Sequence, residues 1–391
     1  MTDAASDRPG DGPTGGPARQ VPGQGSGTRR RLAAVTERRG LAAVTERRQQ
    51  LAGVGGRAGS LEAPHRRAQA GPRIIERVSI RAYRGASWLL AHVPARLAWT
   101  VIGVFVQASY VFWSKKRRWV NANFAHVLDQ DADSVAVRRL ALRAYRNYAR
   151  YLVELMRLPN LPHDVAVGQV DTQGMATLEG IWRAEGSVIL VAAHVGNNEA
   201  VAAGLAWKGF PINVVADDSA FPEMFEMLRR QREAWGVRLI PWRNLRETYR
   251  VLRTGEILAL LVDWGYRSDG IPVRLFGAWT TLPAGPAVLA ARSGATILPI
   301  VARRNPDGRF LVTHDEPIRV ASSEPAELAR ATQAIADALE RTIAAAPEQW
   351  YSFKPLWPET PAESERLAAI AASRGLPRLS EATEGAGAGG R

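Results

Sequence analysis

The segment from residue 188 to residue 200, VILVAAHVGNNEA, constrains the fold more than any other part of the chain. An apolar run of strand character ends abruptly at His194, and a helical pattern begins five residues later at Glu199. The Gly-Asn-Asn triplet between them suits a turn and a helix cap. The segment therefore predicts a buried strand that delivers a histidine and a carboxylate to the edge of a sheet.

Strand and helix patterns alternate along the chain beyond Gly180. The expected strands are Val188–Ala193, Ile212–Ala216, Val237–Pro241, Ile257–Val262, Val273–Phe276, Thr296–Val301 and Phe310–Val312. The expected helices are Glu199–Lys208, Pro222–Trp235, Leu245–Thr254, Pro283–Ser293 and Pro325–Ala345. This interleaving predicts an α/β fold with a mainly parallel central sheet covered by helices. Active sites in such sheets lie at the carboxyl ends of strands, which is where we expect His194.

A histidine paired with a carboxylate at this edge suits the removal of a proton from an alcohol. The carboxylate can orient the imidazole and stabilise its charged form. The same His-x4-Glu spacing also fits a histidine whose hydrogen bonds are satisfied on a loop. The pattern predicts that His194 is a general base with Glu199 as its partner, and the loop histidine is the alternative.

Three further features come from later parts of the chain. Asp263 ends a second apolar run, ILALLVDWG, so that it can share an edge with His194; a helix cap or a surface turn is the alternative. Gly285 lies in a loop that opens an apolar helix, and the free N–H groups of such a helix suit a phosphate or an oxyanion. Arg229 and Arg232 lie in MLRRQREAW between two expected strands. One of these guanidinium groups can bind a phosphate, and the alternative is that the arginines of this segment only form an exposed, hydrated face of a helix.

The first 71 residues differ in composition from the rest of the chain. Gly and Pro are dense, aromatic residues are absent, and no apolar stripe is sustained. Such a composition predicts a disordered tail. The octapeptide LAAVTERR occurs at 32–39 and again at 41–48. A duplication in a tolerant tail and a basic amphipathic helix that touches anionic lipid are both compatible with this repeat.

A largely apolar segment, 86–113, comes next, and its cleanest part is Leu97–Trp113. That part lies near the lower length limit of about 17 residues for spanning a bilayer. Aromatic side chains near its ends and the basic cluster Lys115–Arg118 are typical of a segment at the cytoplasmic face of a membrane. The segment predicts membrane attachment, by insertion or by lying in the interface, with a buried helical hairpin as the alternative. The pattern over 131–158 predicts a packing helix with a solvated basic side.

The chain of 391 residues carries a formal net charge of +13. This charge attracts polyanions such as nucleic acid, an anionic membrane leaflet or phosphorylated substrates. Much of the excess lies in the tail and in the basic cluster after the apolar segment, and no nucleic-acid recognition module is recognisable. The absence of cysteine excludes disulfides, thiolate metal sites and cysteine nucleophiles, and we predict no metal site.

Six short motifs occur in a fixed order along the chain. They are HVGNNE at 194–199, DWG at 263–265, VRLFG and TTLPAGPAVLA within 273–290, ATILPIVARR at 295–304, and PEQWYSF at 347–353. An apolar segment, basic residues and NANF at 121–124 precede them. Over roughly residues 85–357 this set resembles the bacterial lysophospholipid acyltransferase superfamily, in the branch of the lipid A late acyltransferases and the phosphatidylinositol mannoside acyltransferases.

The resemblance implies a glycerolipid acyltransferase-like α/β core with an N-terminal membrane-associated helix, at the cytoplasmic face of the plasma membrane. It implies acyl transfer from a thioester of coenzyme A or acyl carrier protein to a hydroxyl of a glycolipid or lysophospholipid. No other cofactor and no acyl-enzyme is implied. By resemblance His194 is the general base and Glu199 its partner. Arg232, with Arg229 as the alternative, matches the family's arginine, and Asp263 matches its second carboxylate.

The chain departs from the family pattern in three places. Gly265 stands where many lipid A enzymes carry a second acidic residue, and Asn198 stands where relatives often carry a bulky one. Glu199 stands where the mannoside branch usually has Asp. These departures affect the identity of the acceptor lipid, which stays open, more than they affect the predicted class of reaction. The expected domains are a disordered basic tail at 1–71, a membrane-associated helical segment at 72–125, an acyltransferase domain at 126–357, and a C-terminal helix with a flexible tail at 358–391.

The leading hypothesis is a membrane-associated O-acyltransferase. Its expected partners are a lipid acceptor, an acyl thioester and the cytoplasmic membrane, and not nucleic acid. A basic nucleic-acid-binding protein and a non-catalytic membrane scaffold that retains the fold are the alternatives. Both ends of the His-x4-Glu motif are present, which favours the enzyme. The acceptor, the acyl-chain length, the thioester carrier and the oligomeric state stay open.

Overall fold

The structure is a computed structural model and describes residues 73–171, 175–217 and 221–374. These residues all belong to one compact unit of the chain, 68–391. The predicted disordered tail at 1–71, with its repeated octapeptide, lies outside the described residues. So does the end of the predicted C-terminal tail, beyond residue 374.

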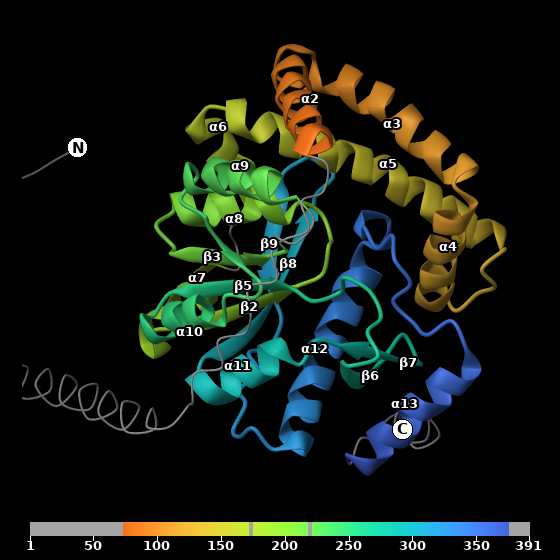
Figure 1. Cartoon of the computed structure of the whole chain (residues 1–391), viewed down its shortest axis with the longest axis vertical. Coiled ribbons are helices and arrows are strands. Elements are labelled where there is room, and N and C mark those ends of the chain that lie inside the picture. Colours follow the sequence, from red (N-terminus) through yellow and green to blue (C-terminus); the bar gives the residue numbers. More distant parts are fainter. Residues whose placement is uncertain (1–72, 172–174, 218–220, 375–391) are drawn as a thin grey trace, which may run out of the picture. The chain divides into compact units, whose positions relative to one another are not determined.

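A seven-stranded sheet forms the centre of the described chain (Figure 1). In spatial order its strands are β1 (Val170–Asp171), β9 (Phe310–His314), β8 (Thr296–Arg304), β2 (Val188–Ala192), β5 (Ile257–Leu261), β3 (Ile212–Ala216) and β4 (Arg238–Pro241). Neighbouring strands are parallel except β8 and β9, which are antiparallel. The mainly parallel α/β sheet predicted from the sequence is confirmed.

Helices separate most of these strands along the chain. The first four are α2 (Arg73–His92), α3 (Ala95–Phe112), α4 (Ser114–Leu128) and α5 (Val135–Arg157). The later ones are α6 (His163–Gly168), α7 (Met175–Glu185), α8 (Asn198–Trp207), α9 (Pro222–Glu233), α10 (Leu245–Arg253), α11 (Gly285–Ser293), α12 (Pro325–Ala345) and α13 (Pro361–Ser373).

Helices pack on both faces of the sheet because its central strand is apolar on both sides. Every residue of β2 is buried, and successive side chains along a strand point to opposite faces. Ile189 belongs to the core cluster that includes Leu339 of α12, whereas Leu190 belongs to the cluster that includes Leu205 of α8. The uninterrupted apolar run before His194 is thus explained by helices on both faces.

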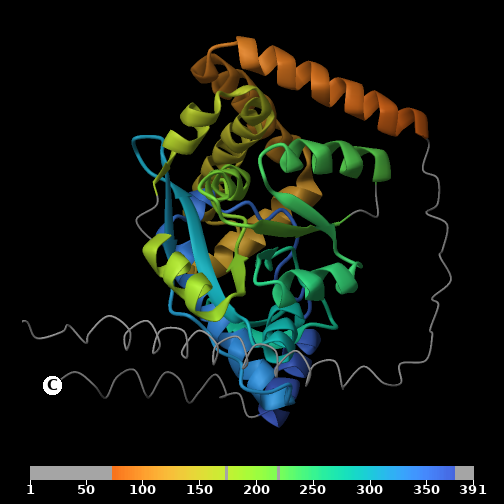
Figure 2. The same cartoon turned by 90° about the vertical axis from the view of Figure 1, so that its left-hand side faces the viewer.

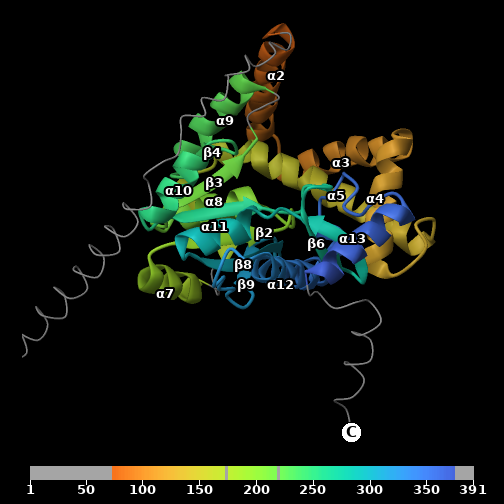
Figure 3. The same ribbon diagram turned by 60° about the horizontal axis from the view of Figure 1, so that its bottom comes forward.

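The helix α5 joins the amino-terminal helices to the rest of the unit. It contacts α2, α3 and α4, and its buried stripe includes Leu140, Ala144 and Val153. The Ser134 side chain caps its first turn by accepting a hydrogen bond from the Val137 N–H. The predicted packing helix over 131–158 is confirmed. Figures 2 and 3 also show that α2 runs alongside α9, where the Met224 N–H donates to Glu76 Oε1 at 3.0 Å.

The helix α3 covers most of the predicted membrane segment. By length and composition it is long and apolar enough to cross a membrane, and 17% of its 18-residue window is buried. It packs against α5 on one side. Its other side exposes large apolar side chains, among them Val104, Phe105 and Phe112.

The sequence predicts Val273–Phe276 as one of the strands of the fold, but this segment does not belong to the central sheet. Strands β6 (Ile271–Leu275) and β7 (Ala278–Leu282) form a separate antiparallel hairpin. Phe276 and Gly277, between the two strands, have φ of 48° and 71°. Two successive positive φ angles are typical of the tight turns that favour hairpins. Residues 280–282, just before the predicted helix that begins at Pro283, are therefore part of β7.

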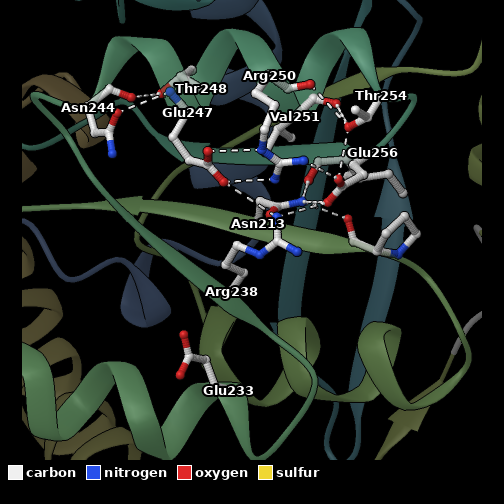
Figure 4. Close-up of polar contacts among 12 residues, drawn as sticks. Asn213, Glu233, Arg238, Asn244, Glu247, Thr248, Arg250, Val251, Thr254 and Glu256 are labelled. Carbon is white, nitrogen blue, oxygen red and sulfur yellow. Dashed lines mark hydrogen bonds and ion pairs between the residues drawn. The ribbon is translucent and has the colours of Figure 1, made fainter.

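A polar network ties α10 to the β4 side of the sheet (Figure 4). Asn213 of β3 donates from Nδ2 to Glu256 Oε2 at 3.0 Å, just before β5. Arg250 of α10 pairs with both Glu247 and Glu256, and Arg238 of β4 contacts the same two carboxylates. This network fixes the sheet on the side away from β8.

Candidate active site

The strand register brings His194 and Asp263 together. Strands β2 and β5 are parallel neighbours, and Ala192 is opposite Leu261. His194 and Asp263 each follow their strand by two residues, so they leave the same edge of the sheet side by side. The sequence prediction that Asp263 shares the edge with His194 is confirmed.

Asp263 accepts three hydrogen bonds in a buried position. The Nδ1–H of His194 donates to Asp263 Oδ1 at 2.6 Å, and the His194 backbone N–H donates to Oδ2 at 2.9 Å. The Trp350 indole donates to the same Oδ2 at 2.8 Å. Burial by itself would raise the pKa of Asp263, but attraction to His194 and these hydrogen bonds outweigh burial and lower it. Asp263 is therefore a carboxylate that holds a proton on Nδ1.

The imidazole of His194 has its other nitrogen free for chemistry. Burial opposes protonation of His194, but the charge and the hydrogen bond of Asp263 outweigh burial and raise its pKa. The side chain is 24% exposed, whereas that of Asp263 is 1% exposed. With Nδ1 bound to Asp263, Nε2 is the nitrogen that can accept a proton from a substrate.

The loop that carries His194 is fixed by the PEQWYSF motif. The Gly196 N–H donates to the Gln349 carbonyl at 3.0 Å, and the Tyr351 N–H donates to the His194 carbonyl at 2.8 Å. Gly196 has a φ of 66°, and a Cβ there would lie 1.7 Å from the Ala302 carbonyl oxygen. Glycine is therefore required at this position.

Glu199 contacts Arg232 and not His194. Arg232 of α9 donates from Nε to Glu199 Oε2 at 2.8 Å and from Nη2 to Oε1 at 2.6 Å. Burial opposes the charge of Arg232, but Glu199 outweighs burial and raises the Arg232 pKa. The expected contact between His194 and Glu199 is thus replaced by two separate pairs. Asp263 reaches Nδ1 because its strand lies in register beside β2, whereas Glu199 leaves the first turn of α8 toward α9.

Arg229 and Gly285, the other predicted binding residues, lie elsewhere. Arg229 pairs with Glu226 and Glu233 on its own helix. Of the two arginines that the sequence left open, Arg232 is the one that reaches Glu199. Gly285 begins α11, which packs against α10, α12 and β8, and it does not line the cavity beside His194. The structure does not bring these two residues to His194.

A cavity of about 480 Å³ opens beside His194. Both Glu199 and Asp263 line it, together with residues of α4, α5 and the segment 351–354. Trp264 is 64% exposed here, with its ring centroid 5.4 Å from that of His194. Lys354 Nζ lies 4.1 Å from the Trp264 ring centroid, a cation–π distance. The cavity is large enough for the polar part of a substrate, and its walls carry aromatic side chains together with basic and acidic ones.

Sequence analysis missed one wall of this cavity. Tyr148, Tyr151 and Tyr351 pack against one another with ring centroids 5.5 to 5.8 Å apart. Burial raises the pKa of all three hydroxyls, so each stays protonated and can donate a hydrogen bond. The signal in the sequence was a pair of tyrosines three apart on α5, which is equally compatible with a core stripe.

An apolar pocket adjoins the cavity between α8 and the sheet. It shares Asn198, Glu199 and Leu261 with the cavity beside His194. Its remaining walls are apolar, with Val201 and Leu205 from α8. Polar groups at the mouth and apolar groups behind it suit the end of an acyl chain, but the pocket, at about 60 Å³, is too narrow here to hold a long one.

No group of three or more His, Cys, Asp or Glu side chains suited to a metal ion occurs within 73–171, 175–217 and 221–374. The acid–base groups at this edge of the sheet form three sets. They are the His194–Asp263 pair, the Glu199–Arg232 pair and the tyrosine wall.

Comparison with known proteins adds a family and several relatives. Residues 72–359 match the family described as bacterial lipid A biosynthesis acyltransferase. A phosphatidylinositol mannoside acyltransferase of Mycolicibacterium smegmatis is 26% identical over 278 residues, which cover 70% of this chain and 89% of that protein. The proteins of the same description from two Mycobacterium tuberculosis strains are each 28% identical over 234 residues, which cover 58% of this chain and 73% of theirs.

Proposed function

The chain belongs to the bacterial lipid A biosynthesis acyltransferase family, and from this membership we propose that it transfers a fatty acyl group from a thioester to a hydroxyl of a glycolipid. The observation that carries the proposal is the buried Asp263 carboxylate on Nδ1 of His194, which itself faces a cavity. A histidine held in this way is a general base and needs no nucleophilic residue.

The reaction proceeds by direct transfer between the two substrates. Nε2 of His194 accepts the proton of the acceptor hydroxyl as its oxygen attacks the thioester carbonyl carbon. The new C–O bond forms, the C–S bond breaks, and the leaving thiolate takes the proton back from the imidazolium. Asp263 keeps the ring oriented and stabilises its positive charge between these steps.

Charge on the reacting carbonyl oxygen requires hydrogen-bond donors within the same cavity. The protonated hydroxyls of Tyr148 and Tyr151 line that cavity and supply them. Glu199 acts as a positioning residue. Its ion pair with Arg232 ties the first turn of α8 to α9, and its negative charge also raises the His194 pKa.

The acceptor is a phosphatidylinositol mannoside, and the donor is an acyl thioester of coenzyme A or of acyl carrier protein. The relatives that match over the greater part of their length are phosphatidylinositol mannoside acyltransferases, which supports this acceptor. The acyl chain points toward the apolar pocket beside α8, whose mouth shares Glu199 and Leu261 with the cavity at His194, and the pocket widens from its present volume of about 60 Å³ to admit the chain.

The enzyme attaches to the membrane through α3 lying in the interface. One side of α3 packs on α5, and α5 exposes Arg139, Arg143 and Arg146. If α3 spanned the bilayer, α5 and its arginines would be drawn toward the hydrocarbon, at a cost of at least about 2.5 kcal/mol for each charge at the centre. In the interface the exposed Phe105 and Phe112 enter lipid while the arginines stay near the phosphates.

The proposal is tested with the purified full chain in mixed micelles. Palmitoyl-CoA is the donor, a phosphatidylinositol mannoside is the acceptor, and a lipid A precursor is the competing acceptor. We expect mass spectrometry to show a mannoside product with one additional acyl chain. Transfer to the lipid A precursor alone would contradict the proposed acceptor, and no transfer to either acceptor would contradict the proposed reaction.

A further inference from the structure

A second cavity, of about 540 Å³, lies beside the one that contains His194. Residues of α4 form one wall, and the segment 355–359 forms the other. Trp119 lines both cavities, and Lys115 and Lys116, which are adjacent in sequence, line one each. The two cavities therefore meet at the Trp119 side chain, and one extended ligand can occupy both.

The cations that face this second cavity form no ion pair with any described residue. Lys115 and Arg118 are exposed and line the cavity. Lys115 Nζ lies 4.8 Å from the Trp119 ring centroid, and Arg118 makes no hydrogen bond within the described chain. Other arginines of the described chain form ion pairs, such as that between Arg330 and Glu327. Two cations left free at one cavity are suited to a phosphate.

The second cavity also carries the groups that bind a sugar ring. The half-buried Trp119 lines it, and aromatic faces pack against the apolar faces of sugars, whereas Trp357 is only 5% exposed and forms the base of the wall. The Glu359 carboxylate, fixed by a hydrogen bond from the Trp119 indole at 2.9 Å, can accept hydrogen bonds from hydroxyls. His126 stacks on Trp357 with ring centroids 4.3 Å apart. Burial lowers the pKa of His126, which leaves a neutral imidazole to share hydrogen bonds with hydroxyls.

Asn123 holds the far wall of this cavity in place. Its buried side chain donates to the carbonyls of Ser352 and Lys354, and its Oδ1 accepts the Leu356 N–H at 3.0 Å. Asn123 thus fixes the segment that runs from the cavity at His194 to the second cavity. A preorganised wall loses little conformational entropy when a ligand binds.

We propose that this second cavity binds the phosphorylated sugar headgroup of the acceptor lipid while the hydroxyl to be acylated lies at His194. The inference rests on the proposed function and names its acceptor subsite. Lys115 and Arg118 contact the phosphate, and Trp119 packs on the sugar. Because Lys115 comes three residues after the end of α3, an acceptor anchored in lipid beside α3 presents its headgroup here.

The nucleotide of a coenzyme A donor is the other source of a phosphorylated sugar. The negative charge of Glu359 repels this nucleotide more than it repels the acceptor headgroup, because the nucleotide carries more negative charge than a single phosphodiester. The two sources are distinguished by which substrate loses affinity when the cations are removed.

The test is the double variant Lys115→Ala/Arg118→Ala of the full chain, with a phosphatidylinositol mannoside and palmitoyl-CoA in mixed micelles. We expect the KM for the mannoside to rise at least about tenfold because two charge-assisted contacts are lost. We expect kcat, the KM for palmitoyl-CoA and the slow hydrolysis of palmitoyl-CoA without acceptor to stay within about twofold of wild type. Hydrolysis also reports that the variant is folded.

The matched control is Arg81→Ala/Arg84→Ala, which removes two exposed cations from α2 outside both cavities. An equal rise in the mannoside KM for this control would overturn the proposal, because the rise would then come from weaker general attraction between the basic protein and the micelle. An unchanged mannoside KM in Lys115→Ala/Arg118→Ala, or a rise in the palmitoyl-CoA KM instead, would overturn it too. A wild-type chain that transfers nothing would refute the proposed function itself, which is a separate result.

Discussion

At the scale of single residues, His194 is held by two parts of the chain that are far from it in sequence, Asp263 and the pair Trp350 and Tyr351. Asp263 bonds its ring and its backbone N–H, and Tyr351 bonds its carbonyl. Trp350 in turn donates to Asp263. The imidazole is therefore oriented through Nδ1 and through its own backbone, which leaves Nε2 as the atom that the proposed reaction uses.

We expect His194→Ala to lower the rate of acyl transfer by on the order of a hundredfold or more, the scale for loss of a general base. Initial rates with a saturating thioester measure this, and circular dichroism provides the control for folding. A variant that retains more than a tenth of the wild-type rate would leave the histidine without a catalytic role.

The Glu199–Arg232 pair makes a stability prediction. Because only 11% of the Arg232 side chain is exposed, Glu199→Ala leaves a nearly buried cation without its partner. We expect this variant to unfold at a lower urea concentration than wild type, with a free energy of unfolding that is about 1–3 kcal/mol smaller. The double variant Glu199→Leu/Arg232→Met should recover much of that loss. If the double variant were less stable than Glu199→Ala, the pair would not have the role assigned here.

Residue patterns predicted one half of the catalytic arrangement and missed the other. His194 and Asp263 could be placed because each follows an apolar strand, and parallel strands end at a common edge. The partner of Glu199 could not be placed, because Arg232 lies 33 positions away on another helix and two neighbouring arginines have the same chemistry. The indole of Trp350 reaches Asp263 across 87 positions, and no local pattern carries that contact.

At the scale of helices and strands, local periodicity was sufficient wherever one face is buried. The strand over Ile212–Ala216 and the helix over Pro325–Ala345 have the predicted bounds. The hairpin β6–β7 was missed because its second strand, AWTTL, carries no apolar–polar alternation, and its turn places Phe276 at a positive φ, where glycine is usual. The packing of such a short strand decides its structure more than its own sequence does.

The helix α3 makes a prediction of its own. We expect Phe105→Glu, on the exposed apolar side of α3, to reduce the fraction of the protein that sediments with anionic vesicles, because a charge then faces lipid. Hydrolysis of a soluble short-chain thioester should be unchanged. Sedimentation equal to that of wild type would show that α3 does not contact the membrane.

At the scale of the whole molecule, the described unit contains the proposed catalytic machinery. We expect removal of residues 1–70 to leave kcat within about twofold of wild type, since every contact described at His194 comes from residues beyond 73. Vesicle binding of the truncated chain can weaken, because the tail is basic. Loss of turnover in the truncated chain would mean that the tail contributes to catalysis.

The account as a whole depends on which carboxylate supports the base. Its most direct test is the pH dependence of kcat in wild type, Asp263→Asn and Glu199→Gln. The neutral imidazole is the active form, and Asp263 raises the His194 pKa, so the wild-type rate should increase with pH through an inflection above 6.5. Asp263→Asn removes the larger of the two interactions that raise the His194 pKa, so it should shift the inflection furthest toward acid. Glu199→Gln removes the smaller one and should shift the inflection only slightly. A larger acid shift in Glu199→Gln than in Asp263→Asn would contradict the account.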